Sequence, residues 1–494
     1  MSQPTATVPG KKPPDRNFQA SVRPQQKPPA CVDALVAQPQ ECSNAGTGAL
    51  VQLAVRPSPN ANAAASNRQW TAAADGGTLP VMTSTEKIEL PACAVSGPLA
   101  GLKVLELGQL IAGPFAARTL ADFGADIIKI ESPGTGDPLR KWRLLKDGTS
   151  VWWQVQSRSK RSVALDLKNP QAQAIVRQLA IDADVLIENF RPGAMEGWGL
   201  GPDDLLKLNP RLIMLRISGY GQTGPYRDKP GFGVVAEAMG GLRHLTAEPG
   251  RVPVRVGVSI GDTLAALHGV IGILLALQER QRSGQGQVID VALYEAVFNC
   301  MESLLPEYSA FGAVRGAAGS ALPGIAPSNA YRCKDDGYTL IAGNGDSIFK
   351  RLMATIGRPE LGADPDLADN AGRVAHVERL DEAIGQWAAQ HTVDEVLAAL
   401  DKVAVPAGRI YTVADIAADP HYRARGMLDE MQMDDGSVLA VPGIVPKLSR
   451  TPGSHRRNAP GIGQDTDAVL LEMGLSPEQI NLLKRQGIVA GEIA

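Results

Sequence analysis

The 494-residue chain has few aromatic side chains and no large excess of charge of either sign. Aromatic residues make up 4% of the sequence, and 49 lysines and arginines stand against 52 aspartates and glutamates, which leaves a net charge of −3. Proteins that bind nucleic acids typically combine a basic surface with aromatic side chains that stack on bases. The composition therefore argues against a nucleic-acid partner.

The sequence also lacks the spacings of a disulfide framework or a metal site. Its five cysteines include no C-x-x-C pair, and none of its six histidines lies four residues from another. We therefore expect a reducing, cytoplasmic environment and no bound metal. The longest apolar run covers only residues 264–277 and is interrupted by His268, so it predicts a buried helix and no membrane partner.

Residues 1–95 differ in composition from the rest of the chain. They are rich in Ala, Pro, Gln, Ser and Asn, and Phe18 and Trp70 are their only aromatic residues. Such a segment buries too little apolar surface to offset its chain entropy, so we expect a disordered leader over 1–95. A native start at Met82 is one explanation of this leader, and an organelle presequence is another.

Short apolar strands alternate with helical patterns in the sequence that follows. The first unit contains a strand, a helical pattern over 112–123 and a second strand. The predicted strands lie at 102–107, 126–131, 163–167, 185–187, 212–217 and 288–292. This alternation predicts an α/β fold in which helices cover the faces of a parallel sheet.

The strongest local candidate for chemistry is Asp262. The first strand–helix–strand unit lacks the G-x-G-x-x-G fingerprint and the Walker A loop, which disfavours a nicotinamide dehydrogenase or a P-loop enzyme. Asp262 stands between a glycine turn at 257–261 and the apolar helix, where a purely structural N-cap is one interpretation. A carboxylate at a helix N-terminus is also held ionised and can act as a nucleophile without a general base.

Basic residues follow or end several predicted strands. Lys160, Arg161 and Arg191 occupy such positions, and ligands of open α/β sheets bind where strands end. Taken alone, side chains of this kind are more often ordinary surface charges in contact with water than ligand contacts.

A series of short motifs follows in unbroken order between about residues 98 and 490. The motifs lie at 105–107, 112–114, 120–131, 134–137, 160–162, 188–193, 218–226, 286–291, 405–408 and 425–427. Together they resemble the family III CoA-transferases of the CaiB/BaiF type, the group of the formyl-CoA:oxalate and carnitine CoA-transferases. Each motif is weak by itself, whereas the ordered set is specific.

The resemblance implies an architecture. Family members are interlaced homodimers in which two chains thread as linked rings, each with a Rossmann-like large domain and a smaller α/β domain. On this basis we assign 96–310 to the N-terminal part of the large domain with the CoA site. Residues 311–425 then form a linker and the small domain, and 426–494 return to the large domain.

The resemblance also implies a reaction. Asp262 would be the nucleophile that accepts the acyl group, and CoA would be a substrate rather than a permanently bound cofactor. The family's CoA contacts correspond to Lys160 beside Arg161, for the phosphates, and to Asn189 and Phe190, for the adenine. The expected partners are an acyl-CoA, a carboxylic acid and a second copy of the chain.

Two alternatives remain at this point. An α-methylacyl-CoA racemase has the same fold but uses a His on the segment that corresponds to 226–233, and this segment contains no His. A catalytically silent CoA-binding protein is the other, and the intact Asp262 argues against it. Phe232 and Gly233 depart from the Tyr and the acidic residue of the formyl-CoA enzyme, which argues against formyl-CoA and oxalate as substrates.

Arg255 is the candidate for substrate selection. It lies in the otherwise apolar run 254–256, seven residues before Asp262, and a charge in such a run is expected to be paired. Its partner is either the distal carboxylate of a short dicarboxylic substrate, with succinyl-CoA as donor, or a nearby acidic side chain.

Overall fold

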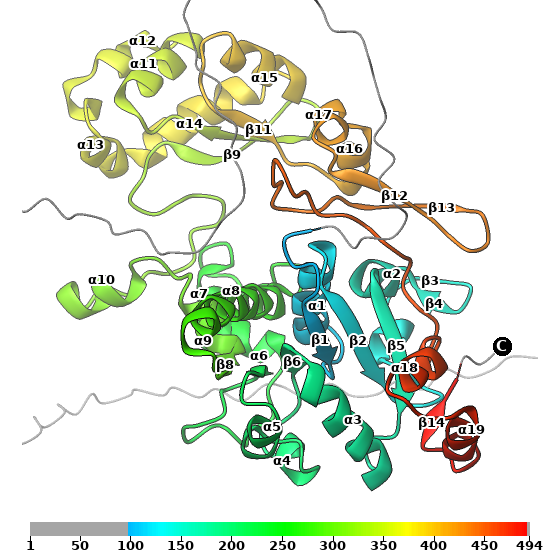
Figure 1. Ribbon diagram of the computed structural model, residues 1–494. Helices are drawn as coiled ribbons and strands as arrows, with labels where there is room; N and C mark the ends of the chain where they lie inside the picture. Colours follow the sequence, from blue (N-terminus) through cyan, green and yellow to red (C-terminus); the bar gives the residue numbers. More distant parts are fainter. Residues whose placement is uncertain (1–96, 492–494) are drawn as a thin grey trace, which may run out of the picture. The chain divides into compact units, whose positions relative to one another are not determined.

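The computed structural model describes residues 97–491, so the expected leader over 1–95 lies outside the described residues. A seven-stranded sheet is the largest sheet of the described chain (Figure 1). Its spatial order is β14 (Val489–Ala490), β5 (Lys160–Leu165), β2 (Asp126–Glu131), β1 (Lys103–Glu106), β6 (Val185–Glu188), β7 (Ile213–Ser218) and β8 (Val288–Ala292). All neighbouring pairs are parallel except β14 with β5, which confirms the predicted mixed α/β fold with a mainly parallel sheet.

The strand order contains one reversal of direction. The chain runs outward from β1 through β2 to β5, and β6 then returns to the other side of β1 and is followed by β7 and β8. The loops after β1 and β6 therefore meet at the carboxyl edge of the sheet. In open α/β sheets this switch point is where ligands bind.

Helices cover both faces of the sheet. Alternate strand residues face opposite sides, so Ile127 packs in one core and Ile130 in the other. One core contains α1 (Ala112–Asp122), α6 (Gly233–Met239), α8 (Ile260–Ser283) and α9 (Leu293–Phe298). The other contains α3 (Pro170–Asp182), α4 (Ala194–Gly197), α5 (Pro202–Leu208), α18 (Thr466–Glu472) and α19 (Pro477–Arg485).

The helix α3 illustrates how the sequence sets an element. Asn169 caps it by accepting a hydrogen bond from the Gln171 N–H, and Pro170 occupies the first helical position, where its missing N–H costs nothing. These two residues fix the start of the helix, which continues to Asp182.

A separate core lies within residues 331–407. A three-stranded antiparallel sheet has the order β11 (Ala407–Arg409), β10 (Tyr338–Ala342) and β9 (Ser328–Arg332). It packs with α11 (Asp346–Thr355), α14 (Val377–Ala388) and α15 (Val393–Asp401), and α15 begins with a capping box of Thr392 and Glu395. The remaining elements are η1 (Pro138–Lys141), β3 (Leu145–Lys146), β4 (Thr149–Ser150), α2 (Val151–Ser157), α7 (Leu242–Leu245), α10 (Leu304–Phe311), α12 (Pro359–Ala363), η2 (Pro365–Leu367), α13 (Asn370–Ala375), α16 (Val413–Ala418), α17 (Pro420–Ala424), β12 (Leu428–Gln432) and β13 (Val438–Pro442).

The helix α8 is longer than the apolar run that predicts it. It has 24 residues, and its length and composition alone would suit a membrane span. Within this chain, Ala265, Ala266 and Ile273 on one side pack into the core against the sheet. On the other side Ile271 and Leu275 are exposed, so the expected buried helix is buried along one side only.

Candidate active site

A cavity of about 670 Å³ opens at the carboxyl edge of the sheet, at the switch point between β1 and β6. Its walls come from the loops after β1, β6 and β7, the start of α6 and the first turn of α8. Four of the sequence-predicted site residues line it together, namely Asp262, Asn189, Phe190 and Arg255. They come from segments more than 60 residues apart in the chain, which the sheet topology brings to one place.

Asp262 is the third residue of α8 and not its N-cap. The helix begins at Ile260, Ser259 occupies the capping position, and no side chain makes a capping hydrogen bond there. The prediction of an Asp262 N-cap is therefore wrong, because the helix starts three residues earlier than that prediction requires. Because the Asp262 carboxylate does not cap the helix, it can face the cavity, whose wall it forms in part.

The surroundings of Asp262 make its carboxylate unusually basic. Burial raises the pKa of Asp262, the nearby Glu237 raises it further, and Arg255 opposes them, with a net pKa of about 6. The helix N-terminus favours the ionised form and lowers the pKa, but this effect is smaller than the rise caused by the loss of contact with water. The carboxylate is still mainly ionised at neutral pH, and it is a stronger base than an exposed aspartate.

Glu237 is a site residue that the sequence analysis missed. It lies on α6 and is completely buried, with Arg243 Nε 3.1 Å from its Oε2 and Arg255 Nη2 3.5 Å from its Oε1. A single acidic residue in the otherwise apolar helix 233–239 is the signal that could have identified it. The acidic partner foreseen as one alternative for Arg255 is therefore present.

Gly233 leaves the space that the Asp262 carboxylate occupies. A Cβ atom at Gly233 would lie 2.1 Å from Asp262 Oδ2, closer than any non-bonded contact permits. The absence of a side chain at this position, which separates the sequence from the formyl-CoA enzyme, is thus a steric requirement of the site.

Asn189 and Phe190 are held by protein contacts at the cavity wall. Asn189 Oδ1 accepts a hydrogen bond from the Gln109 N–H at 2.7 Å, and its Nδ2 donates to the Gln109 carbonyl at 2.9 Å. Phe190 packs edge to face against Trp198, with ring centroids 5.1 Å apart. The Asn189 amide therefore fixes the loop after β1, while both residues still face the cavity.

Lys160 and Arg161 do not line this cavity. Lys160 is completely buried, and its Nζ lies 2.8 Å from Glu106 Oε2 and donates to the Pro114 carbonyl at 2.9 Å. Arg161, the next residue of β5, faces the opposite side of the sheet, as neighbouring strand residues must. The predicted contact of Lys160 and Arg161 with CoA phosphates stays a prediction, and their positions outside this cavity do not favour it.

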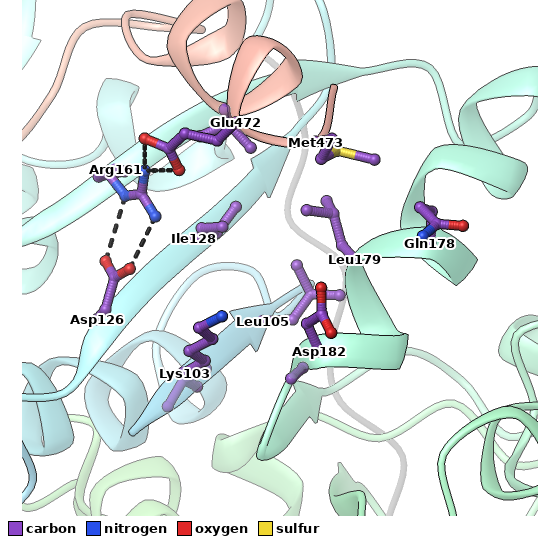
Figure 2. A pocket seen from close by; sticks show the side chains of 13 residues that line it. Lys103, Leu105, Asp126, Ile128, Arg161, Gln178, Leu179, Asp182, Glu472 and Met473 are labelled. Atoms are coloured by element: carbon purple, nitrogen blue, oxygen red, sulfur yellow. Dashed lines mark hydrogen bonds and ion pairs between the residues drawn. The ribbon is translucent and has the colours of Figure 1, made fainter. Parts of the chain in front are cut away.

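Arg161 belongs to a second cavity, of about 240 Å³, near the amino ends of β1 and β2. Figure 2 shows its guanidinium between the carboxylates of Asp126 and Glu472, with N–O distances of 2.7 and 2.8 Å. Ile128 lies near this ion pair, while Leu105 lines the same cavity farther away, near Leu179. The first cavity has other cations on its wall, Arg191, Arg227 and Lys229.

Ser259 also lines the first cavity and belongs to a G-x-S-x-G stretch, residues 257–261. In hydrolases this pattern forms a strand–turn–helix elbow with a histidine base. Here no strand precedes Ser259, and the described residues that line the cavity include no histidine. A serine without a base is a poor nucleophile, whereas the Asp262 carboxylate needs none.

Comparison with known proteins agrees with this geometry. The chain is 45% identical over 394 residues to succinyl-CoA–D-citramalate CoA-transferase of Chloroflexus aurantiacus, covering 79% of this chain and 98% of that protein. It is 43% identical over 397 residues to the beta subunit of succinyl-CoA–L-malate CoA-transferase of the same organism, with coverage of 79% and 98%.

A solved structure of a CaiB/BaiF family protein from Brucella suis matches with a TM-score of 0.68 and 36% identity, covering 76% of this chain and 100% of that one. The profile of CoA-transferase family III matches residues 99–466. The chain belongs to CoA-transferase family III.

Proposed function

We propose that this CoA-transferase moves CoA from succinyl-CoA to a short dicarboxylic acid, with Asp262 as the group that accepts the acyl unit. The observation that carries the proposal is the half-buried, basic Asp262 carboxylate in the wall of the cavity at the switch point of the sheet. The two relatives from Chloroflexus aurantiacus, which are named for succinyl-CoA and for small hydroxy dicarboxylic acids, support the substrate class.

The first half of the reaction moves CoA onto the enzyme. An Asp262 carboxylate oxygen attacks the thioester carbonyl of the donor, the C–S bond breaks, and CoA leaves as a thiolate. The product is a mixed anhydride between Asp262 and the acyl group. The thiolate then attacks the Asp262 carbonyl of the anhydride, which releases the donor acid as a carboxylate and leaves an enzyme–CoA thioester.

The second half repeats these steps in reverse with the acceptor. The acceptor carboxylate attacks the thioester carbonyl of Asp262, and CoA again leaves as a thiolate from a new anhydride. The thiolate attacks the acceptor's acyl carbon, which forms the new acyl-CoA and restores the Asp262 carboxylate. No net proton transfer occurs, so the scheme requires no general acid or base.

Arg255 is the group that we assign to the substrate's distal carboxylate. It lines the cavity with 43% of its side chain exposed, and its contacts to Glu237 Oε1 and Ser259 Oγ are both long, at 3.5 Å. A guanidinium held this loosely has donors left for a carboxylate.

Self-association is part of the proposal. In the described chain, Leu305, Tyr308 and Phe311 of α10 and Ile271 and Leu275 of α8 expose large apolar side chains. Exposed apolar surface of this extent marks an interaction site, and a second copy of the chain in an interlaced homodimer would cover it. We also assign the enzyme to the cytoplasm, where succinyl-CoA would be its substrate.

Replacing the nucleophile tests the first claim. Asp262→Asn should abolish CoA transfer and leave CoA binding within about two-fold, because the carboxamide keeps the shape of the side chain and lacks the nucleophilic oxygen. Hydroxylamine added with succinyl-CoA should form Asp262 hydroxamate in the wild type only, as detected by peptide mass spectrometry. Transfer at more than a few per cent of the wild-type rate would refute the assignment.

The close approach of Gly233 to Asp262 gives a second test. Gly233→Ala should lower kcat by about a hundred-fold, because the added methyl group displaces the Asp262 carboxylate by an ångström or more. Gly197→Ala is the matched control, since a Cβ atom there meets nothing within 4 Å. Equal rates for the two variants would show that the carboxylate position does not limit the reaction.

The raised pKa of Asp262 predicts the pH dependence of the reaction. Because only the carboxylate attacks, kcat/KM for succinyl-CoA should be level above pH 7 and fall as the pH drops through about 6. Glu237→Gln removes a negative charge that raises this pKa, so it should move the fall to lower pH. A profile that stays flat to pH 5 would contradict the assigned pKa.

Substrate selection is tested at Arg255. Arg255→Met should raise KM for succinate and other dicarboxylates by about ten-fold or more, because a charge-assisted hydrogen bond is lost, and should leave KM for butyrate almost unchanged. Steady-state kinetics with both acids supply the comparison. An equal rise in KM for the two acids would contradict a contact between Arg255 and the distal carboxylate, and would leave the ion pair with Glu237 as its role.

The assembly is tested in solution. Size-exclusion chromatography with light scattering should give a dimer mass at assay concentrations, and thermal unfolding should depend on protein concentration because linked chains have no folded monomer. A folded monomer under these conditions would exclude the interlaced arrangement.

A further inference from the structure

Six charged side chains lie buried together beneath the loop that follows β1. They form a buried charge cluster of Glu106, Lys129, Glu131, Asp137, Arg140 and Lys160. None of the six lines the cavity of Asp262. Five of the six belong to the sequence motifs at 105–107, 120–131, 134–137 and 160–162, and Arg140 follows the third of these motifs. The reaction scheme gives none of these motifs a role.

Strand register explains why these charges meet. In the parallel sheet Glu106 is paired with Lys129, and Ile127 with Lys160. Residues two apart in a strand share a face, so Lys129, Glu131 and Lys160 all lie on the face that carries Glu106. Asp137 and Arg140 reach the same place from the turn after β2 and from η1.

Charge balance makes the burial tolerable. Three carboxylates face three cations, and the two central contacts join Lys129 Nζ to Glu106 Oε1 and to Asp137 Oδ2, each at 2.9 Å. Burial alone would lower the pKa of Lys129, but the neighbouring carboxylates outweigh it and raise that pKa. Removing one member would leave an opposite charge buried without a partner, which is strongly destabilising.

The cluster also holds the backbone of the loop. Lys129 Nζ donates to the Gly108 carbonyl at 2.7 Å, and the Leu110 N–H donates to Asp137 Oδ1 at 3.1 Å. Leu110 has φ of 64°, a left-handed conformation that is unfavourable for a residue with a Cβ atom. Such a conformation persists only where the surroundings fix it, and Asp137 fixes it here.

The same loop forms a wall of the active-site cavity. Gln109, Leu110, Ile111 and Ala112 all line it, with Asn189 holding Gln109 from the other side. We propose that Lys129 and Asp137 are positioning residues for CoA-thioester binding, which hold the 108–112 loop in shape without touching the substrate. The inference rests on the proposed function in one respect, that this cavity receives the CoA thioester.

Asp137→Asn is the direct test, since it keeps the side-chain shape and removes the charge that faces Lys129. At a temperature where the variant is folded, CoA affinity by calorimetry should fall about ten-fold and KM for succinyl-CoA should rise in parallel, because binding must then order the loop. The kcat value should stay within about three-fold, because Asp262 lies on α8, outside the loop.

Asp122→Asn is the matched control. Asp122 makes a buried ion pair with Arg158, with two N–O distances of 2.8 Å, at the far end of α1 from the loop. It should lose stability without losing CoA affinity. If Asp137→Asn does not fold, the double variant Lys129→Met with Asp137→Asn removes one charge of each sign, which buried sites tolerate better, and the same loss of affinity is expected.

The outcomes separate the two claims. Normal CoA binding by folded Asp137→Asn or by the double variant, with active wild type, overturns the inference and leaves the proposed function standing. Equal affinity losses in Asp137→Asn and Asp122→Asn also overturn it, because the effect would then be general destabilisation. A wild-type protein that binds no CoA overturns the proposed function and the inference together.

Discussion

The active site depends on a carboxylate that is kept out of water beside a second carboxylate. Asp262 is largely enclosed, and the completely buried Glu237 adds to the pressure against its ionisation. Arg255 opposes this rise in the pKa of Asp262, Arg243 pairs with Glu237, and Gly233 leaves room for the Asp262 side chain. A basic yet ionised carboxylate follows from this balance, and it is the kind of group that the proposed reaction needs, since that scheme uses no other base.

The sheet places this carboxylate opposite a second set of buried charges. The switch point between β1 and β6 opens the cavity at the carboxyl edge, with Asp262 on one wall and the 108–112 loop on another. Lys129 and Asp137 form hydrogen bonds with the backbone of that loop, at Gly108 and Leu110. In the proposed scheme, charged side chains serve two purposes within one domain: Asp262 would react, and the buried charge cluster would shape the space in which it reacts.

The sequence predicts the parallel sheet correctly, because the alternation of strands and helices is a local pattern. It also places Asp262 at the start of the apolar helix, although Asp262 lies in the first turn and is not the N-cap. It does not predict that Lys160 and Arg161 face opposite sides of β5, because the predicted strand begins at residue 163 whereas β5 begins at Lys160. Glu237 is missed although it is the one acidic residue in the apolar stretch 233–239. Its partners, Arg243 and Arg255, lie outside that helix, so the sequence does not show that the glutamate is paired and buried beside Asp262.

The two interpretations of Arg255 that the sequence leaves open are compatible in the structure. Glu237 has two arginine partners, and Arg243 at 3.1 Å is the closer one. The contact with Arg255, at 3.5 Å, is the weaker of the two by distance, and Arg255 is the more exposed of the two arginines. Arg255 can therefore turn toward a substrate carboxylate without leaving Glu237 unpaired. The same movement would take positive charge away from Asp262 and make its carboxylate more basic, which couples recognition of a dicarboxylate to the strength of the nucleophile.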